Sequence, residues 1–273
     1  MLAYMGPEGT FSHQAALKVK NPNEQLKKYN NLYDVISAVD SAEVERAIVP
    51  IENSIEGSVN ATIDTLALIA DVFITGEYVL EINENIILKK GFKKSDIKKL
   101  TSHPQPIGQC SNIINLEFPD AEKEFVESTA RSAEIVSNSD GSIACVGPSA
   151  LAEIYDLDIL FANCADVKNN STRFVIVEKQ PNRTVGKKDK TSIAFTLDNR
   201  PGALFEALGL LASSNINMLK IESRPFKDEL GKYIFLIDVE GNIDDAKIYF
   251  ALDKIKQHTD FYKFLGSYSI IER

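Results

Sequence analysis

The chain has 273 residues, of which 44% are hydrophobic, and a formal net charge of −9 at pH 7. This length predicts about two domains, each large enough to bury a core. The acidic balance excludes the basic surface that nucleic-acid-binding proteins need. The sequence shows neither a signal peptide nor an apolar run long enough to cross a membrane. We therefore expect a cytoplasmic protein with no membrane partner and with its three cysteines reduced.

Short apolar strands alternate with amphipathic helices through the first 180 residues. Strands are predicted at residues 2–5, 47–49, 85–88, 99–102, 142–146 and 173–177. Apolar residues that repeat every three or four positions predict helices after Thr10 and across residues 63–70. This alternation is typical of an α/β fold with mostly parallel sheets.

The chain changes character near residue 180. Residues 179–190 are polar and basic and contain Pro and Gly, so they are predicted to form a linker. Beyond them we expect strands at residues 192–197, 216–226, 232–239 and 261–271, with helices at residues 202–213 and 243–257. The order βαββαβ predicts a ferredoxin-like unit.

Two polar motifs follow predicted strands near the N-terminus. The first, GPEGTFS at residues 6–12, places the hydroxyls of Thr10 and Ser12 at a helix start, where free N–H groups attract anions. A tight turn with a helix cap explains this motif equally well. The second, VPIENSIEGSV at residues 49–59, places Glu52, Asn53 and Ser54 just beyond a buried strand, where ligands bind in open α/β sheets. A loop that caps the following helix is the alternative.

Two further motifs lie later in the first 180 residues. SHPQPIGQC at residues 102–110 again joins a strand to a helix, and Ser102 and Gln109 are its candidate ligand donors. His103 beside a proline is more often structural. In NNSTRF at residues 169–174, Thr172 and Arg173 stand at a strand start, and a guanidinium can bind a carboxylate through two hydrogen bonds. A surface ion pair is the alternative for Arg173.

The C-terminal unit carries two segments of interest. Residues 199–204, NRPGAL, open the first predicted helix, and residues 222–225, ESRP, end the following strand. A plain helix cap and a plain strand end are the alternatives. The three histidines are far apart and no ligand cluster is visible, so neither a metal nor an organic cofactor is expected.

Together and in this order, the segments GPEGTFS, VPIENSIEGSV, SHPQ with a downstream QC, and STRF resemble the prephenate dehydratase family, and the C-terminal part resembles an ACT domain. The resemblance implies a two-lobed α/β catalytic domain over residues 1–180, similar to a type II periplasmic binding protein. One lobe is expected from about residues 1–75 plus 160–180 and the other from 76–159. A ferredoxin-like ACT regulatory domain is expected over residues 190–273.

The same resemblance implies the decarboxylating dehydration of prephenate to phenylpyruvate in phenylalanine biosynthesis, without a fused chorismate mutase. Thr172 matches the essential threonine and is expected to act at the leaving hydroxyl, with Glu52 supplying the proton. Asn53, Ser102 and Gln109 are expected to position the substrate, and Thr10, Ser12, Ser54 and Arg173 to contact it. L-Phenylalanine is the expected effector, bound by Asn199, Gly202, Ala203, Leu204, Glu222, Ser223, Arg224 and Pro225 in a homodimer or homotetramer.

Two other functions remain open from the sequence. Arogenate dehydratase differs only in the substrate, which carries an amino group in place of the keto group. A non-catalytic amino-acid sensor or small-molecule-binding protein would also suit a two-lobed fold, although the presence of Thr172 argues against it.

Overall fold

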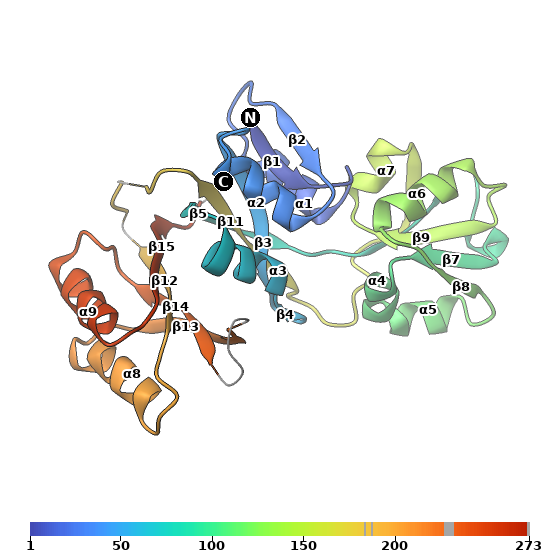
Figure 1. The fold of residues 1–273 in the computed structure, drawn as a ribbon. Coiled ribbons are helices and arrows are strands. Elements are labelled where there is room, and N and C mark those ends of the chain that lie inside the picture. The colour runs from blue at the N-terminus through green and yellow to red at the C-terminus, as the bar shows by residue number, and fades with distance from the viewer. Residues whose placement is uncertain (183, 187, 227–231, 272–273) are drawn as a thin grey trace.

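The computed structural model describes residues 1–182, 184–186, 188–226 and 232–271. Its described strands form three sheets, one in each of two α/β lobes and one in a C-terminal domain. Figure 1 shows the three units in a row, with lobe 1 between lobe 2 and the C-terminal domain. None of the helices in these residues is long and apolar enough to cross a membrane.

Lobe 1 is built on a sheet with the strand order β2-β1-β3-β11-β5, in which β4 pairs with β3. Buried apolar runs explain its central strands, since five consecutive residues of β3 are buried. The strands are β1 (Leu2–Met5), β2 (Leu26–Tyr29), β3 (Arg46–Asn53), β4 (Gly57–Ser58), β5 (Phe73–Glu81) and β11 (Ser171–Glu178). The helices are α1 (Phe11–Val19), α2 (Leu32–Asp40), α3 (Asn60–Asp64) and a π-helical turn, η1 (Thr65–Ile69).

Lobe 2 is built on a sheet with the order β10-β6-β9-β7-β8. Its strands are β6 (Asn85–Lys89), β7 (Lys99–Ser102), β8 (Glu122–Phe125), β9 (Ile143–Gly147) and β10 (Leu157–Phe161). Its helices are α4 (Pro104–Gln109), α5 (Ser111–Glu117), α6 (Thr129–Asn138), α7 (Ala150–Ile154) and a 3₁₀ turn, η2 (Lys94–Asp96). All six strands predicted for the two lobes are present, whereas β2, β4, β5, β8 and β10 were not predicted.

The chain passes between the lobes twice, at residues 82–84 and 162–170. The predicted lobe boundaries near residues 75 and 160 fall inside β5 and β10, so both crossings lie later than expected. Strand β5, which precedes the first crossing, and strand β11, which follows the second, are antiparallel neighbours in lobe 1. The chain leaves lobe 1 along β5 and returns along β11. Lobe 2 likewise begins and ends with two antiparallel neighbours, β6 and β10, so both sheets are mixed. The expectation of mostly parallel sheets was therefore wrong.

The C-terminal domain has the predicted βαββαβ order. Its sheet runs β13-β14-β12-β15, made of β12 (Asp189–Thr196), β13 (Met218–Pro225), β14 (Tyr233–Glu240) and β15 (Tyr262–Ser269). The helices α8 (Ala203–Ser213) and α9 (Ala246–Gln257) pack against one face, where Ile193, Phe195 and Ile237 lie. Strand β12 begins inside the segment that was predicted to be a linker.

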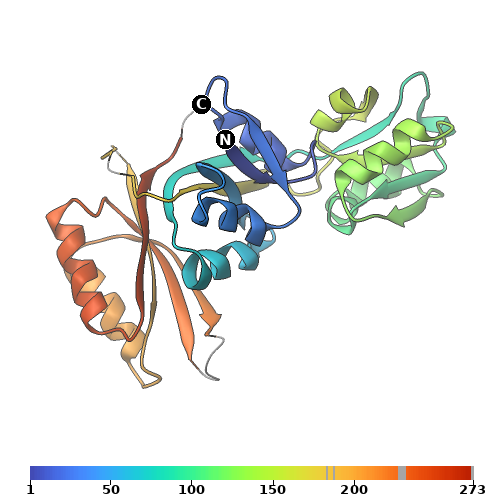
Figure 2. The same cartoon turned by 45° about the horizontal axis from the view of Figure 1, so that its top comes forward.

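The other face of this sheet packs against lobe 1. Alternate residues of the same strands, including Ala194 and Leu236, share one buried core with lobe 1 residues such as Val49. Figure 2 shows β15 running along lobe 1. A Cβ added to Gly266 in β15 would lie 2.1 Å from the carbonyl oxygen of Ile74 in β5, so this close approach requires glycine. The C-terminal domain is thus part of the folded core rather than a tethered module.

Candidate active site

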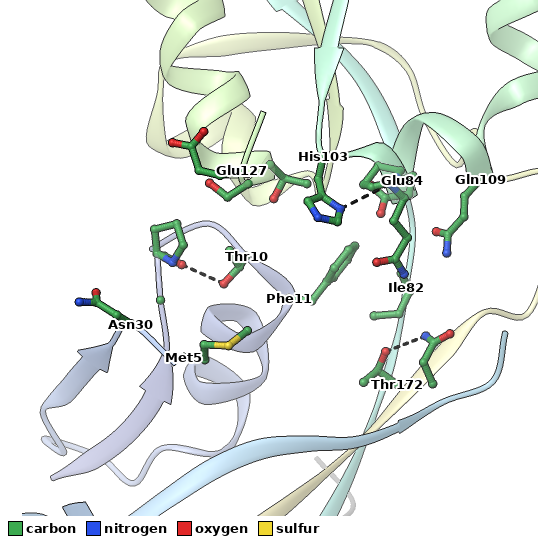
Figure 3. Close-up of a pocket in the computed structure, with 17 residues that line it drawn as sticks. Met5, Thr10, Phe11, Asn30, Ile82, Glu84, His103, Gln109, Glu127 and Thr172 are labelled. Atoms are coloured by element: carbon green, nitrogen blue, oxygen red, sulfur yellow. Dashed lines mark hydrogen bonds between the residues drawn. The ribbon is translucent and has the colours of Figure 1, made fainter. Parts of the chain in front are cut away.

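A cavity of about 650 Å³ lies between the two lobes (Figure 3). Lobe 1 contributes the β1–α1 turn, the end of β3 and the start of β11, and lobe 2 contributes the starts of α4 and α6. The first crossing, residues 82–84, also reaches it. The cavity is lined by Met5, Gly6, Pro7, Thr10, Phe11, Asn30, Asn53, Ile82, Glu84, His103, Gln105, Pro106, Gln109, Glu127, Ser128, Thr129 and Thr172.

Thr172 and Asn53 form the lobe 1 side of this cavity. They are paired across β11 and β3. The Asn53 side-chain amide donates to Thr172 Oγ1 at 2.9 Å and to Asn170 Oδ1 at 2.8 Å. Its oxygen accepts from the backbone N–H groups of Ile55 and Glu56, both at 2.9 Å. These bonds fix the amide orientation, and because Thr172 Oγ1 acts as an acceptor toward Asn53, its own proton remains available to a ligand.

Gln109, at the end of α4 in lobe 2, also lines the cavity. Its side-chain oxygen accepts from Asn170 Nδ2 at 3.5 Å. Its nitrogen is buried and has no hydrogen-bond partner within the described residues. A buried amide without a partner is costly unless a ligand satisfies it. Three of the predicted site residues, Thr172, Asn53 and Gln109, therefore line one cavity with two unused donors.

Helix starts supply the positive potential in this cavity. Among the described lining residues none is Lys or Arg. The N-termini of α1 and α6 open onto the cavity from opposite lobes, capped by the side chains of Thr10 and Ser128, which accept from His13 N and Arg131 N. The first N–H groups of a helix have no intrahelical partner and carry partial positive charge. The cavity thus offers anion-binding helix starts on both lobes, that of α1 on lobe 1 and that of α6 on lobe 2.

Three serines that were predicted to contact a ligand do not line the cavity. Ser102 is fully buried and donates to the carbonyl oxygen of Val146 at 2.6 Å, which ties β7 to β9. Ser54 accepts from the N–H of Ser171 at 3.0 Å and so supports the segment that carries Thr172. Ser12 is buried in α1. Their predicted roles as direct ligand donors are corrected to supporting ones.

Glu52 and Arg173 also lie outside the cavity. Successive strand residues face opposite sides of a sheet, so Arg173 points away from the side on which Thr172 lies. Its guanidinium pairs with Glu77 and with Asp238 of the C-terminal domain, both at 2.7 Å. Glu52 pairs with Lys220 of the C-terminal domain at 3.0 Å and with Arg173 at 3.4 Å. The predicted carboxylate contact of Arg173 and proton delivery by Glu52 do not fit this geometry.

Glu84 was not predicted as a site residue, although it lines the cavity. It is only 2% exposed, and burial raises its pKa to about 8. One of its carboxyl oxygens has no hydrogen-bond partner among the described atoms. In the sequence it is one of two glutamates in EINEN, and nothing in that pattern distinguishes the buried one from exposed Glu81.

The predicted effector site is only partly assembled. A hollow of about 140 Å³ at the start of α8 is lined by Asn199, Ala203 and Leu204. Gly202 adopts a left-handed conformation there with φ of 86°. The side chains of Glu222 and Arg224 turn to lobe 1, where they bind Ser58 and Asp64, at 2.7 and 3.2 Å.

Strand alternation places Ser223 and Pro225 on the opposite face of β13 from Glu222 and Arg224. The expectation that all four ESRP side chains contact the effector is therefore corrected, because two of them serve the domain interface.

Comparison with known proteins agrees with this architecture. The family model for prephenate dehydratase matches residues 2–182, and that for the ACT domain matches residues 191–257. A prephenate dehydratase of Methanocaldococcus jannaschii is 40% identical, over 98% of each chain. The structure of a prephenate dehydratase from Arthrobacter aurescens in complex with L-Phe is 32% identical with a TM-score of 0.89, covering 98% of this chain and 89% of that one.

A second solved structure of the same TM-score, 0.89, carries a different description. It is GqqA, described as a novel type of quorum quenching acylase, which is 28% identical and covers 99% of this chain and 98% of its own. The family models and the M. jannaschii relative span both domains of the chain. The chain belongs to the prephenate dehydratase family.

Proposed function

We propose that the protein is a prephenate dehydratase of phenylalanine biosynthesis, which works in the cavity between the lobes. The observation that carries this is the convergence of Thr172, held by Asn53, and the unpartnered amide of Gln109 on a cavity with a helix start on each lobe. Prephenate carries two carboxylates and a ring hydroxyl. One helix start for each carboxylate suits such a dianion in a cavity without a cationic side chain among its described lining residues.

The reaction requires the protein to orient the substrate and to assist the departure of one leaving group. The bond from the ring to its carboxylate breaks and releases CO₂, and the electron pair enters the ring. The C–O bond breaks at the opposite carbon, and the oxygen leaves with its pair as water once it is protonated. Aromatisation drives both events. Thr172 Oγ1 donates a hydrogen bond to the leaving oxygen, an interaction that strengthens as charge develops there.

We further propose that L-phenylalanine inhibits from the ACT domain. The A. aurescens relative is described in complex with L-Phe. The hollow at the start of α8 offers apolar contact from Leu204 beside a helix N-terminus that suits a carboxylate. Arg173, which is bound to Asp238 of the ACT domain, directly follows Thr172 in β11. Displacement of the ACT sheet would thus bias the position of the catalytic threonine, as an allosteric effector must.

Assembly and location complete the proposal. Strand β13 is an edge of the ACT sheet, with Leu219 and Ile221 44% and 40% exposed, and Phe205 on α8 is 80% exposed. An apolar sheet edge is a ready surface for a second copy, so we propose a homodimer or homotetramer. Light scattering that reports only monomers at micromolar concentration would contradict this. The three cysteines are free and buried, in keeping with a reducing, cytoplasmic setting.

The acylase described for GqqA is not favoured by this cavity. An acylase that uses a hydroxyl nucleophile needs a base hydrogen-bonded to it. Thr172 Oγ1 is bonded to the amide of Asn53, and Thr10 Oγ1 donates to the carbonyl oxygen of Pro7 at 2.8 Å. Neither hydroxyl meets a carboxylate or an imidazole among the described contacts.

The test is turnover of prephenate by the purified full-length chain, with phenylpyruvate followed by its ultraviolet absorbance in alkali. Arogenate is assayed in parallel, with formation of phenylalanine as the readout. We expect turnover of prephenate, faster than turnover of arogenate, and inhibition on addition of L-phenylalanine. Absence of turnover with both substrates would refute the proposal, and a clear preference for arogenate would reassign the substrate.

A further inference from the structure

Glu84 occupies a position that no described lining residue duplicates. It lies in the crossing at residues 82–84, where it reaches the cavity from between the lobes. Its backbone carbonyl accepts from the N–H of Cys164 at 2.7 Å, a bond that joins the first crossing to the second. The residue is therefore anchored through its main chain, while the side chain lines the cavity and is almost completely buried. Figure 3 shows Glu84 and His103 among the residues that line the cavity.

The surroundings of Glu84 favour a neutral carboxyl group. No described cation pairs with it, and one carboxyl oxygen has no hydrogen-bond partner in this part of the chain. Burial of an unpaired carboxylate is costly, so such a group takes up a proton instead. Burial accordingly raises the pKa of Glu84 to about 8. A bound dianion in the same cavity would favour the protonated form further.

Neither the cysteine thiols nor Glu127 replaces Glu84 as a buried acid. Burial raises the pKa of the thiols of Cys110, Cys145 and Cys164, so these groups are neutral and far weaker acids. Glu127, the other carboxyl at the cavity, is exposed to water. His103 Nδ1 accepts from the N–H of Gln105 at 3.4 Å, which engages the ring in the cap of α4.

We infer that Glu84, as a neutral carboxylic acid, is the proton donor to the leaving hydroxyl group of prephenate. This inference rests on the proposed function. As the C–O bond breaks, the oxygen takes the carboxyl proton and leaves as water, and Glu84 becomes a carboxylate that regains a proton from solvent before the next turnover. Thr172 holds the oxygen by a hydrogen bond, a role that a hydroxyl can perform where proton donation would be too difficult.

The test compares three variants with the wild type across pH 5–10. Glu84→Gln keeps the size and the neutral charge but has no acidic proton. We expect kcat to fall by about 10²–10³-fold, with KM within threefold, because a general acid contributes roughly that factor to the chemical step. Wild-type kcat should fall as the pH rises through about 8, where the donor ionises, and Glu84→Gln should lack this alkaline limb. Glu81→Gln, in the same segment but exposed, is the matched control and should behave as wild type.

Glu84→Asp retains an acid but withdraws it from the cavity. We expect at least a tenfold loss in kcat with the alkaline limb preserved, a result that decides the matter even if Glu84→Gln fails to fold. If wild type turns over prephenate and kcat is undiminished in Glu84→Gln or in Glu84→Asp, this inference is overturned while the proposed function stands. An alkaline limb that persists in Glu84→Gln would overturn it as well. A wild type that fails to convert prephenate would instead refute the proposed function.

Discussion

The ion pairs around Arg173 permit a quantitative prediction about the interface that joins the ACT domain to lobe 1. Arg173→Met removes the partner of Asp238, whose side chain is 2% exposed and keeps only the Ser192 hydroxyl at 2.5 Å among its described contacts. Glu77 loses one partner as well but retains Lys190 at 2.7 Å. The substitution therefore leaves one buried carboxylate, that of Asp238, without its cationic partner.

The size of the effect follows from burial. Loss of one partner of a buried ion pair costs about 3–5 kcal/mol, since the remaining charge is left without compensation. Removal of the second charge as well, in Arg173→Met with Asp238→Leu, should restore most of that stability because apolar side chains of similar size replace the pair. The exposed pair Arg131–Glu134 is the control, and Arg131→Met should cost less than about 1 kcal/mol.

The assay is urea unfolding followed by far-ultraviolet circular dichroism, since the chain has no tryptophan. In the double variant, which keeps the fold but lacks the charged link behind Thr172, inhibition by L-phenylalanine should weaken by several-fold while turnover persists. A cost below about 1 kcal/mol for Arg173→Met, or a double variant no more stable than the single one, would refute the assignment of this network as the buried link between the domains.

Three further predictions concern single positions. Gly266→Ala would press a methyl group against the carbonyl of Ile74, so we expect a loss of about 2–3 kcal/mol in unfolding free energy by urea titration. Gly202→Val forces the loop before α8 out of its left-handed conformation, and L-phenylalanine inhibition should be lost with kcat retained; unchanged inhibition would exclude this loop from the effector site. The folded-state pKa of Glu84, about 8, lies above its unfolded value, so its contribution to stability is present at low pH and lost as the pH rises through 8. The melting temperature of Glu84→Gln should therefore rise relative to that of wild type as the pH is raised through 8.

The fold could be predicted from the sequence where hydrophobic patterning is regular. Continuous apolar runs identified the buried central strands such as β3 and β9, and the βαββαβ order identified the ACT domain. Strand β5 was missed because it buries a charged residue, Glu77, whose partners come from β11 and from the ACT domain. Strand β8, EKEF, is a polar edge strand without a buried face. Patterning within one segment carries no information about such distant partners.

The candidate site was predicted in part. Asn53, Gln109 and Thr172 do meet, although their sequence positions are far apart, because strand ends from one lobe face a helix of the other. Period-two alternation could have shown that Thr172 and Arg173 do not face the same cavity. The burial of Glu84 could not have been predicted, since it depends on how the two lobes close over the crossing. Removal of the residues after 180 would expose apolar surface of lobe 1 that is buried against the C-terminal domain, so regulation is better tested in the full chain.

The central claim is that prephenate is dehydrated at Thr172 in the cavity between the lobes. The most direct measurement is the rate of phenylpyruvate formation by wild type and by Thr172→Val, which keeps the shape of the side chain and removes the hydroxyl. We predict turnover by wild type, and for the variant a loss of about 10²–10³-fold in kcat with an unchanged melting temperature. Wild type that leaves prephenate intact, or a variant as active as wild type, would contradict the claim.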